Sequence, residues 1–326
     1  MARSRRNGVH AQKDDFLDKT DYLLTMTQAV TITSAQYPIT EHADFASWQR
    51  HTEKWVADAA IRGANLLLFP EYGAMELVSI FNAEIRADIR RQIQELDALK
   101  DDFCKTFEML ARKYGVIIVA PSIPVIEHAR NLNRAFVFSP TGMAGYQDKF
   151  FMTRFENEHW GIESAPRQLT VFEADWGKFG IQICYDVEFP IGARKLSDAG
   201  ANLILAPSCT ETIRGATRVH VGARSRALEN QCYTVVSQTV GEALWSPAVD
   251  VNYGYAACYT TPDKNMPEEG IIGTMPAQQE GWLMQNLDFA LIEEVRADGH
   301  VFNFKDQSRV TLEMKDAAIS VVHTKL

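Results

Sequence analysis

Short runs of consecutive apolar residues, separated by stretches with helical periodicity, restrict the fold of this chain most. Leu66–Phe69 and Val116–Ala120 contain no polar position. Strands of this kind are buried on both faces, as in sheets covered by helices. Apolar residues share one helical stripe from Phe45 to near Gly63, and Arg86–Tyr114 predicts a long helix. The pattern therefore predicts an α/β protein whose sheet is covered by helices.

The middle of the chain has a different pattern, with two predicted β-hairpins. One pairs Arg134–Ser139 with Tyr146–Lys149, and the other pairs Thr170–Ala174 with Phe179–Ile183. The remaining elements expected are strands at Thr27–Gln36, Asn202–Ala206, Tyr233–Gln238 and Asn286–Glu294, and helices at Gly192–Ala199 and Arg218–Asn230. Hairpins mixed with crossovers predict one large mixed sheet, or two, flanked by helices.

No repeat or linker divides the 326 residues, so one main domain is expected. Residues 1–25 are polar and unpatterned, which is typical of an N-terminal extension. Residues 26–295 are the predicted domain. Residues 296–326 are a C-terminal tail that we expect to pack on the domain or on a partner subunit.

Composition argues against several classes of partner. A net charge of −9 and a pI of about 5.4 disfavour binding to nucleic acids and to anionic membranes. Apolar runs are far shorter than the roughly 18 residues of a membrane span, and no apolar stretch follows the basic N-terminus as in a secretory signal. The five cysteines lack disulfide-scaffold or zinc-site spacing. We therefore expect a cytoplasmic protein with free thiols.

Cys184 is the first candidate for chemistry. In FGIQICYDVEFP it follows an apolar strand and precedes a helix, an elbow that exposes a nucleophile to backbone N–H groups. Most free cysteines are simply packing residues, so the context must decide. Lys149 ends a predicted strand between aromatic residues, and Glu71 follows a buried strand and a proline. Carboxyl ends of strands are where open sheets bind ligands.

Three segments in this order resemble the nitrilase, or carbon–nitrogen hydrolase, superfamily. They are LLLFPE around Glu71, YQDK around Lys149 and ICYDVEFP around Cys184. The later segments GANLILAPS and GARSRALEN support the resemblance, which extends from Thr27 to about Leu291. It implies a four-layer α-β-β-α sandwich with two mixed β-sheets, commonly assembled as a homodimer or a larger homo-oligomer.

The resemblance also implies a mechanism without metal or organic cofactor. Glu71 would accept the thiol proton of Cys184, which would attack a small amide-like substrate and form a thioester. Lys149 and the backbone N–H of Tyr185 would stabilise the oxyanion. Many members have a second pocket glutamate after the lysine. Glu158 is the candidate here, with Glu156 as the alternative.

The choice of substrate stays open. Tyr185 and Asp186 after the nucleophile resemble amidase and carbamoylase members, whereas nitrilases usually have Trp-Glu there. Glu188 and Ile191 depart from residues common in amidase-type relatives. Hydrolysis of an amide or N-carbamoyl group is therefore the leading hypothesis, and nitrile hydrolysis or a catalytically silent binding module are the alternatives. Cys209 is a weaker candidate nucleophile, and lone histidines such as His159 and His220 do not suggest a metal site.

Overall fold

The computed structural model describes residues 29–316 and 322–325. The expected N-terminal extension, residues 1–25, lies outside the described residues. Helices separate β1, β2 and β3, several later strands follow one another directly, and the predicted hairpins are both present. The strands are β1 Val30–Pro38, β2 Leu66–Leu68, β3 Ile117–Val119, β4 Ile123–Glu127, β5 Arg130–Ser139, β6 Gly142–Asp148, β7 Val171–Ala174, β8 Gly177–Ile181, β9 Leu203–Ser208, β10 Tyr233–Glu242, β11 Val251–Asn252, β12 Ala257–Tyr259, β13 Ile271–Thr274 and β14 Gly281–Leu287.

The strands are connected by hydrogen bonds in the order β4-β5-β3-β2-β1-β10-β9-β8-β7. Parallel pairs fill the centre, where β1 pairs with β2 and β10, while the β5–β6 and β7–β8 hairpins are antiparallel. This mixed sheet curls so that its two halves face each other. Leu66 and Leu68 of β2 share one core cluster with Phe179 and Ile181 of β8 and with Leu205 of β9. These side chains form the layer between the two halves.

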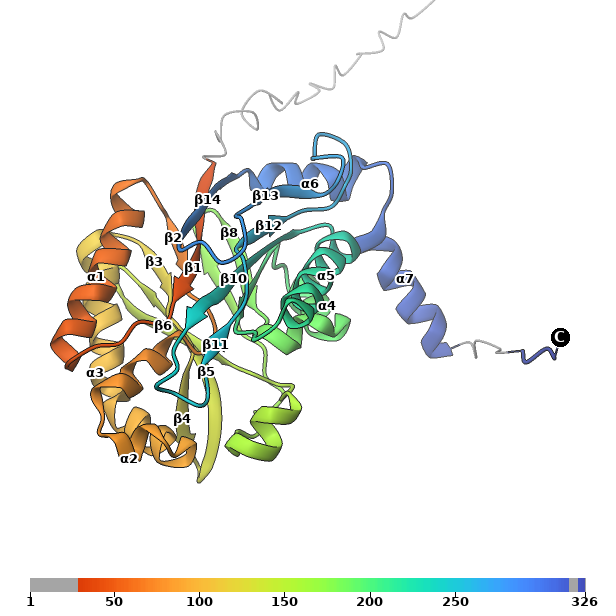
Figure 1. Cartoon of the computed structure of the whole chain (residues 1–326). Helices are drawn as coiled ribbons and strands as arrows, with labels where there is room; N and C mark the ends of the chain where they lie inside the picture. Colours follow the sequence, from red (N-terminus) through yellow and green to blue (C-terminus); the bar gives the residue numbers. More distant parts are fainter. Residues whose placement is uncertain (1–28, 317–321, 326) are drawn as a thin grey trace, which may run out of the picture.

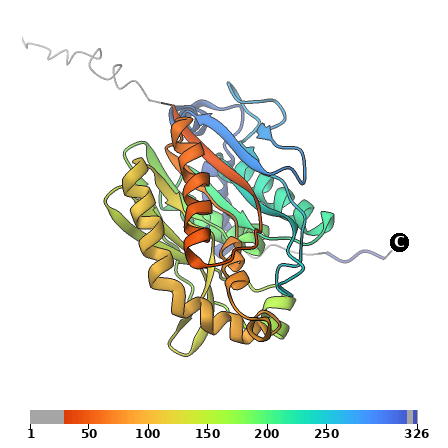
Figure 2. The same cartoon turned by 60° about the vertical axis from the view of Figure 1, so that its left-hand side comes forward.

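Helices cover the outer face of each half. The helices of the described residues are α1 Phe45–Ile61, α2 Ala83–Arg86, α3 Ile89–Tyr114, α4 Pro190–Asp198, α5 Ile213–Asn230, α6 Phe289–Asp298 and α7 Asn303–Asp316, with 3₁₀ helices η1 Gly73–Ile80 and η3 Cys184–Glu188 and a π-helix η2 Glu156–Trp160. Helices α1 and α3 lie side by side over the first half, and α4 and α5 cover the second (Figures 1 and 2). The layers are therefore α-β-β-α, as predicted.

Local signals explain where the long helix begins and ends. Asp88 caps the N-terminus of α3 by accepting hydrogen bonds from two backbone N–H groups of the first turn. Gly115 ends the helix in the left-handed conformation, with φ 67°, which glycine adopts without strain. On its buried face, Phe103 and Phe107 pack against the sheet and α1. The predicted helix from Arg86 is interrupted at Asp88 and continues as α3.

One predicted strand, Asn286–Glu294, is wrong. The chain is in strand β14 only up to Leu287, and α6 then begins at Phe289. Asp288 is the N-cap residue, and its side chain accepts a hydrogen bond from the N–H of Ala290. The apolar run continues across this boundary, so the sequence pattern hid the change from strand to helix.

The beginning of α7 packs on the body of the domain, and the rest of the helix projects away from it (Figure 1). The guanidinium of Arg194 in α4 donates to the carbonyl of Phe304 at 3.0 Å and to the hydroxyl of Ser308 at 2.7 Å. Arg194 and Arg296 both lie over the Phe304 ring. The C-terminal region therefore contacts the domain through α4, α5 and α6.

Candidate active site

The three predicted residues each follow the end of a strand. Glu71 comes shortly after β2, Lys149 directly after β6, and Cys184 at the start of η3, three residues beyond β8. Cys184 has a φ of 50°, in the left-handed region that is unfavourable for a side chain with a Cβ. Such a backbone conformation is typical of a nucleophile elbow. The elbow predicted an exposed side chain. Cys184 is instead buried, at 5% accessibility.

Lys149 occupies the centre of a buried ionic cluster. Its Nζ lies 2.7 Å from Oε1 of Glu71 and 2.7 and 2.8 Å from the two carboxylate oxygens of Glu156. All three side chains are buried. Asn133 donates a further hydrogen bond of 2.9 Å to Oε1 of Glu71. One ammonium group therefore holds two carboxylates in fixed positions.

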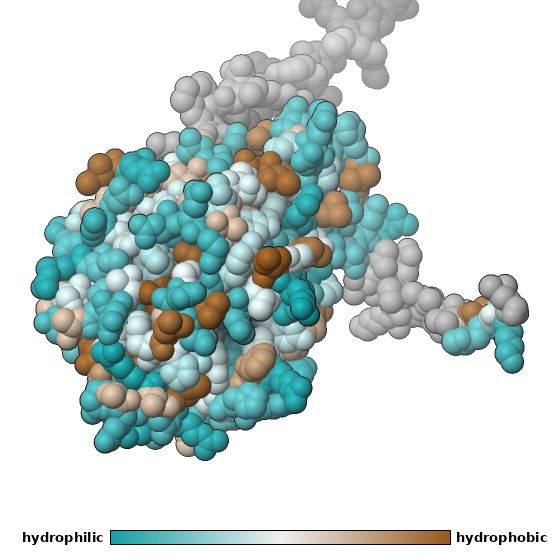
Figure 3. All heavy atoms as spheres, in the orientation of Figure 1, coloured by the Kyte–Doolittle hydropathy of each residue, from teal (hydrophilic) through white to brown (hydrophobic). Residues whose placement is uncertain are grey.

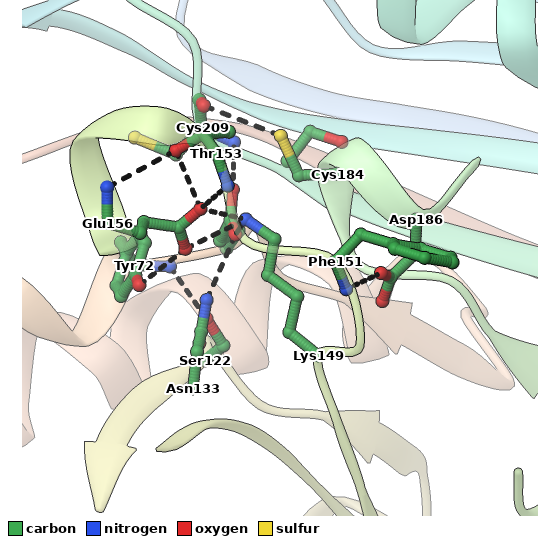
Figure 4. A network of polar contacts seen from close by, with 12 residues as sticks. Tyr72, Ser122, Asn133, Lys149, Phe151, Thr153, Glu156, Cys184, Asp186 and Cys209 are labelled. Carbon is green, nitrogen blue, oxygen red and sulfur yellow. Dashed lines mark hydrogen bonds and ion pairs between the residues drawn. The ribbon is translucent and has the colours of Figure 1, made fainter. Parts of the chain in front are cut away.

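Glu156, and not Glu158, is the glutamate that reaches the lysine. Tyr72 and Thr153 donate to the Glu156 carboxylate as well, at 2.7 Å from the tyrosine hydroxyl and 2.8 Å from the threonine hydroxyl (Figure 4). Glu158 is exposed and forms an ion pair with Arg154 at 2.7 Å. Of the two candidates, only Glu156 reaches the cluster, because the two residues face different sides of η2. Which of them contacts substrate stays a prediction.

Cys184 is linked to Glu71 through the backbone of Cys209. The N–H of Cys209 donates to Oε2 of Glu71 at 3.0 Å, and its carbonyl oxygen lies 3.6 Å from the thiol of Cys184. Figure 4 shows that Cys184, Cys209 and Lys149 lie close together although they come from separate segments of the chain. The side chain of Cys209 points instead to Asn252, with a sulfur-to-oxygen distance of 3.4 Å.

The charges in this cluster influence one another. Burial raises the pKa of Glu71 above its ordinary value, against the opposing effect of Lys149. Burial alone would lower the pKa of Lys149, but the carboxylates of Glu156 and Glu71 raise it well above its ordinary value. Burial and the charge of Glu71 raise the pKa of the Cys184 thiol. The resting cysteine is therefore a neutral thiol beside a carboxylate with an increased affinity for protons.

Asp186 joins the cysteine elbow to the segment after the lysine. Its carboxylate accepts hydrogen bonds from the backbone N–H groups of Phe150 and Phe151, the second at 2.7 Å (Figure 4). Burial raises the pKa of Asp186 to about 7, although these hydrogen bonds act in the opposite direction. Tyr185, between Asp186 and Cys184, is half-buried, and its ring packs edge-on against Phe189.

The arrangement of a cysteine, a lysine and a carboxylate at the strand ends can be compared with known proteins. The family model described as "Carbon-nitrogen hydrolase" matches residues 31–297. The chain belongs to this family. Its match covers every strand from β2 to β14 and includes all the residues of the cluster.

Individual relatives support the assignment of the chain to the carbon–nitrogen hydrolase family. A probable hydrolase, YhcX, of Bacillus subtilis (strain 168) is 33% identical over 280 residues, which are 86% of this chain and 54% of that protein. The chain thus spans about half the length of that relative. A chloroplast omega-amidase of Arabidopsis thaliana is 26% identical over 256 residues, covering 76% of this chain and 64% of that protein.

Solved structures agree on the fold. A carbon–nitrogen hydrolase from Helicobacter pylori G27 superposes with a TM-score of 0.72 at 17% identity, covering 90% of this chain and 99% of the other. At this identity the likeness is one of fold. In the described part of the chain, no helix is both long and apolar enough to cross a bilayer.

Several residues of the cluster were missed by the sequence reasoning. Asn133, Tyr72 and Thr153 all bind one of the two carboxylates. Asn133 is detectable in retrospect, because its carbonyl accepts a hydrogen bond from the N–H of Lys149, so the β5–β6 hairpin brings the two residues together. The contribution of Cys209 is made by its backbone, which no residue type signals.

Proposed function

We propose that this protein hydrolyses the carbon–nitrogen bond of a small amide or N-carbamoyl compound through a thioester on Cys184. The observation that carries the proposal is the buried ion pair between Nζ of Lys149 and Oε1 of Glu71, which are 2.7 Å apart. The backbone of Cys209 links this pair to the thiol of Cys184. The similarity to a chloroplast omega-amidase favours amides among the substrates of the family.

In the proposed first step, the thiol proton of Cys184 passes to Glu71 as the sulfur attacks the substrate carbonyl. The raised pKa of Glu71 fits a general base that works near neutral pH. Because the pKa of the thiol is raised too, the proton leaves during the attack and not before it. Lys149 and the N–H of Tyr185 are the proposed donors to the tetrahedral oxyanion.

In the second step, Glu71 gives its proton to the departing nitrogen, and ammonia or an amine leaves. The thioester remains, and a water molecule deprotonated by Glu71 then cleaves it to the carboxylic acid and the free thiol. Glu156 keeps Lys149 charged and in place throughout, since Lys149 and the backbone N–H of Thr153 lower its own pKa against the effect of burial. This role is positional, because Glu156 transfers no proton in the scheme.

The decisive experiment combines a substrate screen with one variant. Release of ammonia or amine is measured over amides, N-carbamoyl amines and nitriles, and the cysteine adduct is identified by mass spectrometry. We expect turnover of amides or carbamoyl compounds, an acyl adduct on Cys184, and neither in Cys184→Ala. Turnover of nitriles alone would favour the nitrilase alternative. Normal turnover in Cys184→Ala would refute the mechanism, and no turnover of any compound would favour a silent binding module.

We also propose that the protein forms homodimers or larger homo-oligomers through its outer helices. Four large apolar side chains are exposed on α4 and α5: Ile191, Ile213, Val221 and Leu228. Apolar side chains are scattered among polar ones on the face of the molecule that Figure 3 shows. Light scattering that reports a monomer at micromolar concentration would refute this proposal, whereas Val221→Glu should dissociate the assembly.

A further inference from the structure

A second polar cluster lies apart from the candidate active site, within the core between α1 and the sheet. Among the residues that the structure describes, one group of three possible metal ligands stands out: His42, His51 and Glu76. His42 lies in the loop between β1 and α1, His51 in α1, and Glu76 in η1. Their ligand atoms all lie within 4.8 Å of one another.

Both histidines present a buried ring nitrogen without a hydrogen-bond partner. Nε2 of His42 and Nε2 of His51 are each inaccessible and form no hydrogen bond, and the side chain of His42 is only 5% exposed. Leaving such a nitrogen unsatisfied is unfavourable, and two of them side by side require an explanation. Nε2 of His42 lies 3.4 Å from Oε2 of Glu76.

This distance fits two ligands of one cation. Zinc binds nitrogen and oxygen at about 2.0–2.2 Å with tetrahedral angles, which places neighbouring ligand atoms about 3.4 Å apart. The other pairs in the cluster are within 4.8 Å, so the His51 side chain would have to move closer for its nitrogen to bind the same ion. A cation would satisfy both imidazole nitrogens at once.

Glu76 is held as metal-binding carboxylates usually are. Its Oε1 accepts hydrogen bonds from the Tyr37 hydroxyl at 2.7 Å and from the Trp48 indole at 2.8 Å. These donors fix the carboxylate so that Oε2 faces His42. Glu76 is 1% exposed, and its ion-pair partner among the described residues is a histidine that is neutral unless protonated. A buried carboxylate in that setting is stabilised by a cation.

We propose that His42, His51 and Glu76 form a structural binding site for a zinc-class divalent cation. The ion would connect the β1–α1 loop, α1 and η1, and η1 follows directly after the segment that carries Glu71. The site takes no part in the proposed hydrolysis, and its existence does not depend on that function. From the sequence we expected no metal site, because His159 and His220 have no ligand spacing; His42 and His51 come close to Glu76 only in the folded chain.

The test measures metal binding directly in the full-length protein without a histidine tag. The background is Cys184→Ala with Cys209→Ala, so that thiols of the candidate active site cannot retain zinc. After chelation, incubation with a small excess of zinc and gel filtration, we expect about one zinc ion per chain. His51→Gln and Glu76→Gln should lose most of it. His300→Gln, at an exposed position, is the matched control and should retain it.

Two further measurements use the background protein itself, so they do not depend on whether the ligand variants fold. Zinc should raise the thermal unfolding midpoint of the background protein, on the order of 5 °C at a large excess over the dissociation constant. Cobalt(II) in place of zinc should give visible d–d bands without a thiolate charge-transfer band. Failure to retain zinc, absence of the thermal shift, or equal retention by His51→Gln each overturns the proposal.

Discussion

Replacing Lys149 by methionine removes the central charge of the buried cluster at nearly constant volume. The Nζ atom lies 2.7 Å from Glu71 and from Glu156, so the facing carboxylate oxygens are no farther apart than twice that distance. Without the ammonium they repel each other by about 3 kcal/mol, taking a separation of about 5 Å and an effective dielectric constant of about 20. Breaking a buried ion pair typically lowers the free energy of unfolding by about 3–5 kcal/mol.

The chemical step should suffer separately. Loss of one oxyanion donor costs about 10²–10³-fold in kcat. Burial lowers the pKa of Lys149, but the charges of Glu156 and Glu71 outweigh this effect and raise the pKa well above its ordinary 10.5. The contribution of this lysine to stability is therefore complete at neutral pH and is lost only as the pH rises through its folded value. In Lys149→Met the two carboxylates face each other without the ammonium. Their repulsion grows as the pH rises, so the stability of the variant falls with rising pH.

Two assays separate these effects. Urea unfolding at about pH 5 and pH 8 measures stability, and we expect Lys149→Met to be closer to the wild type at the lower pH. Single-turnover kinetics below the unfolding transition measure thioester formation by the folded fraction. Glu158→Gln, which changes an exposed glutamate of the same segment, is the control and should behave as the wild type. Unaltered single-turnover rates in Lys149→Met would refute the proposed role of the lysine.

Three other predictions follow from individual contacts. Cys209→Ala should keep most of the activity, because the backbone of this residue and not its thiol contacts Glu71; a complete loss would contradict this. Tyr72→Phe should lower the free energy of unfolding in urea by about 1.5–3 kcal/mol, since a buried charged acceptor loses a donor, and an unchanged midpoint would count against it. Folding raises the pKa of Asp186 from 3.8 to about 7, so stability falls as the pH rises between these values. Asp186→Asn should lose less stability over this range. If the thermal unfolding midpoints of the two proteins changed equally with pH, the shifted titration would be contradicted.

Elements with a strong local pattern were predictable from the sequence. The strands Leu66–Leu68 and Ile117–Val119 and the long helix α3 have buried apolar faces and clear ends. Asn286–Glu294 failed because its apolar residues fit a strand and a helix equally, and a single capping aspartate decides between them. The short strands β11 to β13 were missed, since two to four residues carry too little periodicity.

The candidate site was only partly predictable for a related reason. Glu71, Lys149 and Cys184 each stand in a recognisable segment at a strand end. Glu156 and Glu158 are two positions apart, and in a helical turn such residues point in nearly opposite directions. The sequence does not show which of the two faces inward. Thr153 is a local donor to Glu156, but the tertiary fold brings the Tyr72 hydroxyl to Glu156 from a distant segment.

The bridge through residue 209 has a consequence for how such a protein can diversify. Both ends of the bridge are peptide groups, which every residue except proline supplies in full. The half-exposed side chain at this position can therefore be exchanged without removing a hydrogen bond to Glu71 or to the thiol of Cys184. A change of shape or polarity at position 209 is thus one mutation away. The side chain there can vary while the backbone keeps Glu71 and Cys184 connected.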